Sequence, residues 1–257
     1  MRSAFEAMIF DLDGVITFTA RVHAAAWKEL FDQFLKERAS RFHEPFREFR
    51  VEGDYLAYVD GKPRYDGVTS FLASRGISLP YGSPSDPPTA ETVCGLGNRK
   101  DNLFTQKVRE VGVDVDRDAV RFVRELRGRG IRVGLASSSR NAVPIIEQAG
   151  IRNLFDEVVD GVVSDRLHLR GKPEPDIFLQ CLSQLSSSAD PLKAGIAEDA
   201  IAGVMAGRRG WFALVLGVDR NKSGVLGRNG ANWVINDFSK ISADEVIRFF
   251  TDRARAA

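Results

Sequence analysis

Hydrophobic residues along the chain follow two different patterns. Near the start, residues 7–10 form a short apolar run that predicts a buried strand. Between about residues 20 and 110, apolar residues recur at helical spacing and no strand pattern occurs. Later, apolar runs that predict strands alternate with helical stripes; these runs are 131–136, 158–159, 194–197, 213–216 and 232–235. Such alternation is typical of a parallel sheet that helices cover on both faces.

The strand at residues 7–10 is expected to join the same sheet, so the helical segment is an insertion. Within it, residues 36–54 are expected to continue as helix with breaks, and residues 80–90 form a proline-rich excursion. We therefore predict an α/β fold with a doubly wound parallel sheet and an inserted all-helical domain. The predicted core is 1–20 and 109–257, and the predicted helical domain is 21–108.

The composition is that of an ordinary globular chain. Of the 257 residues, 44% are hydrophobic and 28% are charged, and the formal net charge is +1. A balance this close to zero gives no general attraction for nucleic acid or anionic membranes. No apolar run approaches the length of a membrane span, and the first residues lack a signal-peptide pattern. Cys94 and Cys181 form no CxxC motif, so we expect a reducing cytoplasm.

Two carboxylates directly follow the first predicted strand. Asp11 and Asp13 are two positions apart, so an extended chain directs both to the same side. Gly14 then allows the backbone to turn sharply. Open α/β sheets bind ligands where strands end, which makes this turn a candidate site. The short motif alone is equally compatible with an acidic surface turn.

Polar residues also follow other predicted strands. Ser137 comes after residues 131–136, Lys172 lies in Gly-Lys-Pro-Glu-Pro-Asp, and Glu198-Asp199 follow residues 194–197. If these strands are neighbours, the groups converge on one crevice, where four carboxylates require a compensating cation. A hard divalent ion such as Mg²⁺ fits oxygen ligands. The predicted ligands are Asp11, Asp13, Glu198 and Asp199.

This combination of residues suits a phosphoryl group. A serine hydroxyl, a lysine charge and Mg²⁺ together match its equatorial oxygens. Asp11 is then the candidate nucleophile, because carboxylates form aspartyl-phosphate intermediates. Asp13 is the candidate acid and base for the leaving and attacking oxygens. Ser137 and Lys172 complete the predicted catalytic set in the core.

These four motifs, in this order, resemble those of the haloacid dehalogenase-like phosphotransferase superfamily. The resemblance covers the whole chain and implies a Rossmann-like core with a type 1 helical cap between the first two motifs. A closer resemblance is to the β-phosphoglucomutase family. It is carried by Asp-Leu-Asp-Gly-Val-Ile-Thr at 11–17 with Thr19-Ala20, His23 and Trp27, by Ala-Ser-Ser-Ser-Arg-Asn at 136–141, and by Gly171-Lys-Pro.

The resemblance also implies roles for residues of the cap. Thr19 would lie at the cap hinge, and His23 would contact Asp13 when the cap swings. His23 shares a helix face with Trp27, so a core histidine is the alternative. Arg64 resembles the cap residue that holds the substrate's non-reacting phosphate, for which arginine offers bidentate hydrogen bonds. The predicted substrate-binding residues are Trp27, Gly61, Lys62, Arg64, Gly67, Arg99, Lys100, Asn102, Ser138, Ser139, Arg140 and Asn141.

Some features depart from the family pattern. Phe18 stands where the family usually has an acid, beside the hinge, where it could alter cap closure or the metal site. Residues 37–54 and 76–95 are longer than the compact cap of the family's best-known members. Segments 60–66 and 92–100 look like a variant seen near disaccharide phosphorylases, which would supply β-glucose 1-phosphate.

The resemblance implies a Mg²⁺-dependent mutase that interconverts β-glucose 1-phosphate and glucose 6-phosphate. The expected intermediates are an aspartyl-phosphate and a 1,6-bisphosphate, with glucose 1,6-bisphosphate as activator. We expect a monomer with a sugar phosphate substrate and with neither nucleic acid nor membrane as a partner. A phosphatase that uses the same core motifs is the main alternative, and only the cap discriminates between them. A non-enzymatic phosphate sensor is a third possibility, against which the large cap argues.

Overall fold

The computed structural model describes residues 5–256 and separates them into two compact units. Unit 1 consists of the residues up to Phe18 and of those from Val113 onward, and unit 2 is Thr19–Gly112. The predicted domain limits, 20/21 and 108/109, lie within a few residues of these divisions and stay a prediction. Two connectors, residues 14–18 and 113–116, are the parts of unit 1 that lead to and from unit 2.

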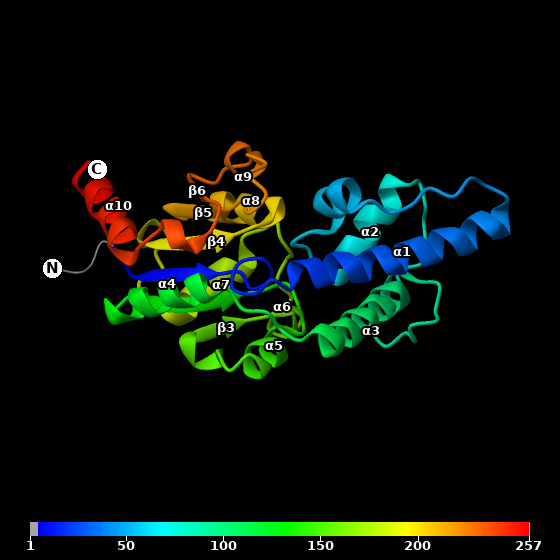
Figure 1. Cartoon of the computed structure of the whole chain (residues 1–257), viewed down its shortest axis with the longest axis horizontal. Coiled ribbons are helices and arrows are strands. Elements are labelled where there is room, and N and C mark those ends of the chain that lie inside the picture. Colours follow the sequence, from blue (N-terminus) through cyan, green and yellow to red (C-terminus); the bar gives the residue numbers. More distant parts are fainter. Residues whose placement is uncertain (1–4, 257) are drawn as a thin grey trace. The chain divides into compact units, whose positions relative to one another are not determined.

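Unit 1 contains a six-stranded sheet in the order β3-β2-β1-β4-β5-β6, and each neighbouring pair is parallel (Figure 1). The strands are β1 (Ala7–Phe10), β2 (Arg132–Ala136), β3 (Glu157–Val159), β4 (Ala194–Glu198), β5 (Leu214–Val218) and β6 (Trp233–Ile235). All are short, and β1, β4 and β5 are fully buried, as expected for strands that are covered on both sides. The predicted doubly wound parallel sheet is confirmed.

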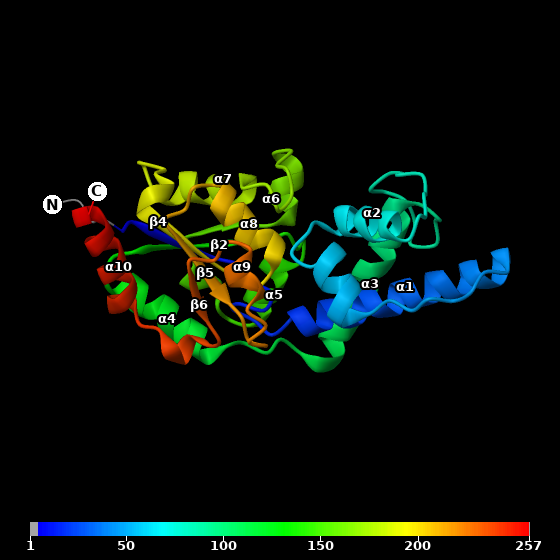
Figure 2. The ribbon, with the colours of Figure 1, turned by 90° about the horizontal axis from the view of Figure 1, so that it is seen from above.

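Helices lie on both faces of this sheet. Figure 2 shows α7 and α8 on one face and α4 and α10 on the other. The helices of unit 1 are α4 (Arg117–Gly128), α5 (Ala142–Gln148), α6 (Gly161–Arg166), α7 (Asp176–Leu185), α8 (Ile201–Arg209), α9 (Val225–Arg228) and α10 (Ala243–Ala256), with short 3₁₀ turns at Arg152–Leu154, Pro191–Lys193 and Phe238–Lys240. Helices α4 and α7 each bury an apolar stripe, and burial of these stripes stabilises the layers.

The two faces of the sheet bury different side chains of β1. Ile9 belongs to a core cluster with Phe178 of α7 and Ile196 of β4. Phe10 points to rings on the other face, with centroids 6.0 Å from Phe122 and 6.3 Å from Phe238. Burying such a side chain contributes about 2 kcal/mol, so both faces anchor β1. The residues that follow β1 therefore start from a rigid position.

Unit 2 is helical and has its own core. It contains α1 (Ala20–Phe42), a π-helical segment (Val51–Val59), α2 (Arg64–Ser74) and α3 (Val93–Val111). Phe31, Phe49 and Phe71 pack together with ring centroids 4.1–5.1 Å apart. The expected interrupted helix over 36–54 is only partly correct. Helix α1 ends where His43 takes a left-handed conformation with φ of 55°, and no regular structure follows until the π-helical segment.

Neither cysteine is part of a disulfide. Cys94 and Cys181 are both free and buried. Burial raises the pKa of the Cys94 thiol and, more strongly, that of Cys181, which keeps both in the neutral form. Within residues 5–256, none of the helices combines the length and the apolar character needed to span a membrane.

Candidate active site

The site in unit 1 begins where β1 ends. The backbone N–H of Asp11 donates to the carbonyl of Ala197 at 3.0 Å, which extends the pairing of β1 with β4 by one residue. This pairing brings Asp11 beside the end of β4, which carries Glu198 and is followed by Asp199. The neighbouring strand β2 ends one residue before Ser137. Three adjacent strands thus deliver polar side chains to one edge of the sheet, as the sequence predicts.

Lys172 lies buried between two carboxylates. Its Nζ donates to Asp11 Oδ1 at 2.6 Å and to Glu198 Oε1 at 2.5 Å, and it stands 4.9 Å from the centroid of the Phe178 ring. Lys172 and Glu198 are almost fully buried, and Asp11 is 7% exposed. Breaking a buried ion pair of this kind by removing one partner is costly, because the other charge is left unpaired. The lysine therefore holds both acids in place.

The charges at this edge determine how the groups titrate. Burial opposes the charged form of Lys172, but the negative charges of Asp11 and Glu198 outweigh it and raise the pKa of the lysine. Burial raises the pKa of the Asp11 carboxyl well above its ordinary value. Lys172 counteracts this increase, whereas the charges of Glu198 and Asp13 add to it. One ammonium cannot balance this many carboxylates, which favours a further cation at this position.

Three carboxylates could hold that cation. Asp11, Glu198 and Asp199 each offer an oxygen within 4.8 Å of the others, and they form a potential metal-binding group in the part of the chain that the structure describes. A set made only of oxygen ligands, beside a single lysine, fits a hard divalent ion such as Mg²⁺. Asp13, the fourth predicted ligand, does not belong to this group, and its contribution to metal binding stays a prediction.

Two glycines make room for these acids. Gly14 has a φ of +85°, and a Cβ at this residue would lie 1.7 Å from Asp199 Oδ2. A Cβ at Gly203 would lie 1.8 Å from Glu198 Oε1. A side chain at either position would displace a carboxylate of the site. Gly14 was predicted from the motif as a turn residue, whereas nothing in the local sequence distinguishes Gly203.

The loop after β2 contains Ser137 and the four residues that follow it. Ser137 is buried; its N–H donates to the Val159 carbonyl at 3.0 Å, and its Oγ accepts the N–H of Ser139 at 3.2 Å. Ser139 Oγ in turn accepts the N–H of Asn141 at 3.2 Å. Arg140 forms an ion pair with Asp165 of α6. Ser138, Ser139, Arg140 and Asn141 thus lie in a turn beside the site, and their contacts with substrate stay a prediction.

Unit 2 contains the remaining predicted residues, and two of them are in contact. Lys100 Nζ lies 2.6 Å from His23 Nδ1, 5.1 Å from the centroid of a Trp27 ring and 4.8 Å from that of Phe104. The His23 ring stacks on Phe104 at 3.8 Å between centroids. His23 thus packs against the helical core of its own unit, consistent with the alternative that it is a core histidine. Its predicted contact with Asp13 stays a prediction.

The loop predicted to bind phosphate is built around a turn. Gly61 has a φ of +73°, and the Lys62 N–H closes the turn on the Val59 carbonyl at 3.1 Å. Lys62 Nζ donates to Ser70 Oγ at 2.8 Å. Arg64 begins α2 and pairs with Asp101 of α3 at 3.0 Å. Asp101 therefore holds the guanidinium, and phosphate binding by Arg64 stays a prediction.

Other predicted residues of unit 2 have structural contacts. Trp27 is buried in the core, and a Cβ at Gly67 would lie 3.4 Å from the Trp27 ring. Arg99 Nε donates to the Pro88 carbonyl at 2.9 Å, which ties α3 to the proline-rich segment. These contacts account for the three residues without a substrate, so their binding roles remain predictions.

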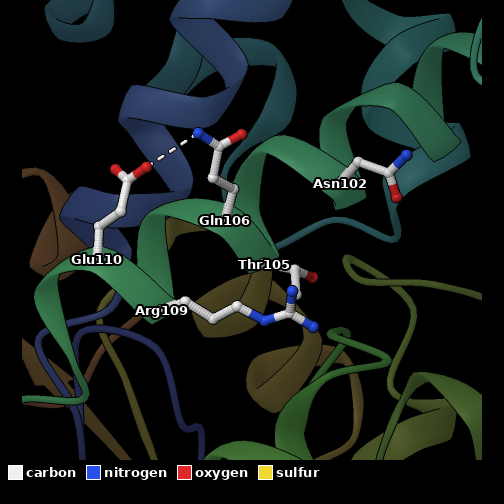
Figure 3. Close-up of a pocket in the computed structure, with 5 residues that line it drawn as sticks. All are labelled: Asn102, Thr105, Gln106, Arg109 and Glu110. Carbon is white, nitrogen blue, oxygen red and sulfur yellow. Dashed lines mark hydrogen bonds between the residues drawn. The ribbon is translucent and has the colours of Figure 1, made fainter.

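Asn102 borders a hollow of about 390 Å³ on α3. Figure 3 shows the five side chains that line it; they are Asn102, Thr105, Gln106, Arg109 and Glu110. Gln106 donates to Glu110 at 2.9 Å along the same helix. Of these five residues, Asn102 is the predicted substrate-binding residue, and the others lie outside the segment that resembles the family.

Sequence reasoning also missed Arg220. It follows β5, at the same edge of the sheet as the predicted site, and donates to the carbonyl of Gly14 at 2.8 Å. Its position after a predicted strand was the available signal. Its partners lie at the opposite end of the sequence, so the contact itself leaves no local pattern.

Comparisons with known proteins agree with this geometry. Residues 5–210 match the family of haloacid dehalogenase-like hydrolases. A protein named β-phosphoglucomutase from Mycobacterium bovis is 43% identical over 239 residues, which is 91% of this chain and 90% of that protein. An uncharacterized glycosyl hydrolase of Mycobacterium tuberculosis is 36% identical over 94% of this chain but 18% of its own length.

A solved structure agrees with the fold. The β-phosphoglucomutase of Clostridium difficile superposes with a TM-score of 0.75 at 22% identity and covers 97% of this chain and 99% of that one. Family match, sequence identity and fold thus all point in the direction that the four motifs predict. The chain belongs to the haloacid dehalogenase-like hydrolases and, within them, to the β-phosphoglucomutase family.

Proposed function

We propose that this protein is a Mg²⁺-dependent phosphomutase that interconverts β-glucose 1-phosphate and glucose 6-phosphate. The observation that carries the proposal is the 43% identity to a β-phosphoglucomutase over 91% of the chain, because that span includes the helical unit as well as the core. In this superfamily the core motifs serve both mutases and phosphatases, so similarity across the helical unit favours the mutase.

Asp11 acts as the nucleophile in this proposal. Phosphorylated Asp11 transfers its phosphoryl group to the 6-hydroxyl of β-glucose 1-phosphate, which gives the 1,6-bisphosphate. After the bisphosphate turns around, the Asp11 carboxylate takes the 1-phosphoryl group, glucose 6-phosphate leaves, and Asp11 is phosphorylated again. Lys172, 2.6 Å away, steadies the carboxylate and offers positive charge to the phosphoryl oxygens. Asp11, Glu198 and Asp199 would hold Mg²⁺, which would neutralise charge on the nucleophile and the phosphoryl group.

Asp13 is proposed as the acid and base. It protonates the sugar oxygen that leaves the phosphoryl group and removes the proton from the hydroxyl that attacks. Glucose 1,6-bisphosphate then serves as both intermediate and activator, because it phosphorylates Asp11. Water must be kept from the aspartyl-phosphate, and closure of the helical unit upon substrate binding would exclude it.

A sugar phosphate phosphatase is the second candidate, favoured by the match to a family described as hydrolases. It would use the same Asp11 and Asp13 but pass the phosphoryl group to water. An assay of both products separates the two. With Mg²⁺ and a trace of bisphosphate, β-glucose 1-phosphate should yield glucose 6-phosphate, and the α-anomer should not. Release of inorganic phosphate as the main product from either anomer would contradict the mutase.

Arg64 is proposed to hold the phosphate that does not react. We expect Arg64→Ala to lower mutase kcat/KM by about 10²-fold, because an arginine clamp aligns the sugar for the attack. Phosphorylation of Asp11 by acetyl phosphate, which has no second phosphate, should stay within about threefold of wild type. Steady-state kinetics and mass spectrometry of the phosphorylated protein measure the two effects.

Arg75→Ala is a matched control for this substitution. Arg75 belongs to the same unit, is similarly buried and pairs with Asp54 at 2.6 Å, as Arg64 pairs with Asp101. Its loss should leave the ratio of the two rates unchanged. If Arg64→Ala lowered mutase turnover and phosphorylation of Asp11 by acetyl phosphate equally, the proposed phosphate contact would be contradicted.

The source of the substrate is proposed from the longer relative. That protein, named a glycosyl hydrolase, contains a segment similar to this chain within a much longer polypeptide. Cleavage of a glycosidic bond by phosphate yields a sugar 1-phosphate, so this juxtaposition supports the phosphorylase link inferred from segments 60–66 and 92–100. A cytoplasmic location, supported by two free buried cysteines, and a monomeric state complete the proposal.

A further inference from the structure

The two connectors of unit 1 pair with each other. Thr17 forms an antiparallel bridge with Val115, and the Phe18 N–H donates to the Asp114 carbonyl at 2.9 Å. The Asp116 N–H donates to the Ile16 carbonyl, also at 2.9 Å. The chain that leaves unit 1 and the chain that returns to it are therefore one small hydrogen-bonded assembly.

The same assembly includes the turn that carries Asp13. The Gly14 N–H donates to the Thr17 carbonyl at 2.7 Å, and both the N–H and the hydroxyl of Thr17 donate to the Leu12 carbonyl, at 3.0 and 3.2 Å. Asp13 lies inside this closed turn, between Leu12 and Gly14. Its backbone position is thus set by the contacts of residues 12–17.

Arg220 contacts both connectors at once. Its Nε donates to the Gly14 carbonyl at 2.8 Å, and one terminal nitrogen lies 3.2 Å from the Val15 carbonyl and 2.7 Å from Asp116 Oδ2. The guanidinium also stands 4.7 Å from the centroid of the Phe18 ring. A planar guanidinium reaches these partners from two separate nitrogens in a fixed geometry, whereas a lysine would have to reach them from a single atom. Phe18, the residue that departs from the family pattern, supplies the ring.

Arg220 is itself fixed to the sheet. It follows β5 by two residues, and its neighbour Asp219 is buried. Asp219 accepts hydrogen bonds from the N–H groups of Ser223 at 3.0 Å and Gly224 at 2.6 Å, and these bonds close the loop around it. The guanidinium therefore links the turn that follows β1 to a fixed point at the end of β5.

We propose that Arg220 is a positioning residue of the reaction, which fixes the Asp13 turn and locks the two connectors together. The inference rests on the proposed mutase function, in which Asp13 moves the proton of the sugar hydroxyl. Loss of Arg220 releases the Gly14 and Val15 carbonyls, and Asp13 then leaves its productive position. Asp11 and its partners Lys172 and Glu198 do not touch the guanidinium and keep their contacts.

Two half-reactions separate this role from a general loss of structure. Transfer from a sugar phosphate requires Asp13, because an alkoxide is a poor leaving group. Transfer from acetyl phosphate to Asp11 releases acetate, which leaves without a proton. We expect Arg220→Ala to lower kcat for β-glucose 1-phosphate about 30-fold, with KM and the acetyl phosphate reaction each within about threefold of wild type. Arg220→Lys keeps the charge, so its kcat for β-glucose 1-phosphate should lie between those of wild type and Arg220→Ala.

Arg121→Ala is the matched control. Arg121 also bonds a backbone carbonyl, that of Phe238 at 2.8 Å, and a carboxylate, that of Glu125 at 2.5 Å, without being bonded to either connector. It should retain both half-reactions. In addition, the double variant Asp13→Asn with Arg220→Ala should catalyse the sugar reaction less than about twofold more slowly than Asp13→Asn alone. Both changes remove the same contribution, proton transfer by Asp13. The inference would be overturned if the effects of Arg220→Ala and Asp13→Asn on the sugar reaction multiplied in the double variant. It would also be overturned if Arg220→Ala slowed both half-reactions equally.

Amide hydrogen exchange tests the same proposal without any turnover. Arg220→Ala should speed the exchange of the Gly14, Thr17 and Phe18 amides at least about tenfold, whereas Arg121→Ala should not. If the wild-type protein proves unable to isomerise the sugar phosphate, the proposed function fails. This measurement still tests whether Arg220 holds the turn and the two connectors in place. Unchanged exchange in Arg220→Ala would overturn the positioning role whatever the activity.

Discussion

Asp11→Asn is expected to abolish mutase turnover, with a loss of about 10⁴-fold or more, because the amide cannot accept the phosphoryl group. The variant should fold, since asparagine has the same shape and can still accept a hydrogen bond from Lys172 Nζ, which lies 2.6 Å from Asp11 Oδ1. The protein should also no longer gain a phosphoryl group from acetyl phosphate. Coupled kinetics, mass spectrometry and thermal unfolding measure the three properties.

Asp156→Asn provides the control for this substitution. Asp156 lies in the same unit, accepts the Val133 N–H at 2.8 Å and pairs with Arg132 at 3.3 Å, so its carboxylate has a structural role. Its replacement should change stability slightly and leave turnover within about threefold. Turnover by Asp11→Asn above a hundredth of the wild-type rate would exclude Asp11 as the nucleophile.

Lys172→Met is expected to impair both catalysis and stability. Without the ammonium, the carboxylates of Asp11 and Glu198 remain buried with no cation between them, which costs about 3–5 kcal/mol. For a unit of this size that corresponds to a fall in Tm of about 10 °C in metal-free buffer. Turnover should fall about 10³-fold, because the positive charge that we propose faces the phosphoryl oxygens is lost.

Metal dependence distinguishes this effect from simple loss of packing. The more negative site of Lys172→Met should bind Mg²⁺ more favourably, so Mg²⁺ should raise its Tm more than it raises that of wild type. Lys193→Met is the control, because Lys193 forms a partly exposed pair with Glu6 at 3.2 Å and should change neither property. A Mg²⁺-induced shift equal to that of wild type would contradict the assignment of the metal to Asp11, Glu198 and Asp199.

The sheet was predictable because its strands leave a clear pattern. Short apolar runs separated by helical stripes indicate parallel strands, and polar residues after such runs must lie at one edge. This reasoning brings Asp11 and Glu198 together although they are far apart in the sequence. The prediction that Lys172 also stands at a strand end is wrong, because α6 follows β3 and Lys172 lies in the loop between α6 and α7. It reaches the two acids from that loop. The irregular stretch after Phe42 and the π-helical segment were not predicted, because tertiary packing rather than local periodicity determines them.

Contacts between distant loops could not be predicted in the same way. The hydrogen bond from Arg220 to Gly14 joins residues 206 positions apart, and neither end has a distinctive neighbourhood. Gly203 is similarly unremarkable in sequence, although Glu198 occupies the space that a side chain would need. Such positions depend on the packed arrangement of the whole unit, whereas the motifs at Asp11, Ser137 and Glu198 depend on strand ends.

Phosphorus NMR of the protein with Mg²⁺, β-glucose 1-phosphate and a trace of glucose 1,6-bisphosphate, in water enriched in ¹⁸O, tests the central claim most directly. The account predicts that the glucose 6-phosphate resonance grows as the substrate disappears, without inorganic phosphate and without an isotope shift. In that case the phosphoryl group passes from sugar to Asp11 and back to sugar. Inorganic phosphate carrying ¹⁸O, with no glucose 6-phosphate, would mean that water completes the cycle and would contradict the mutase.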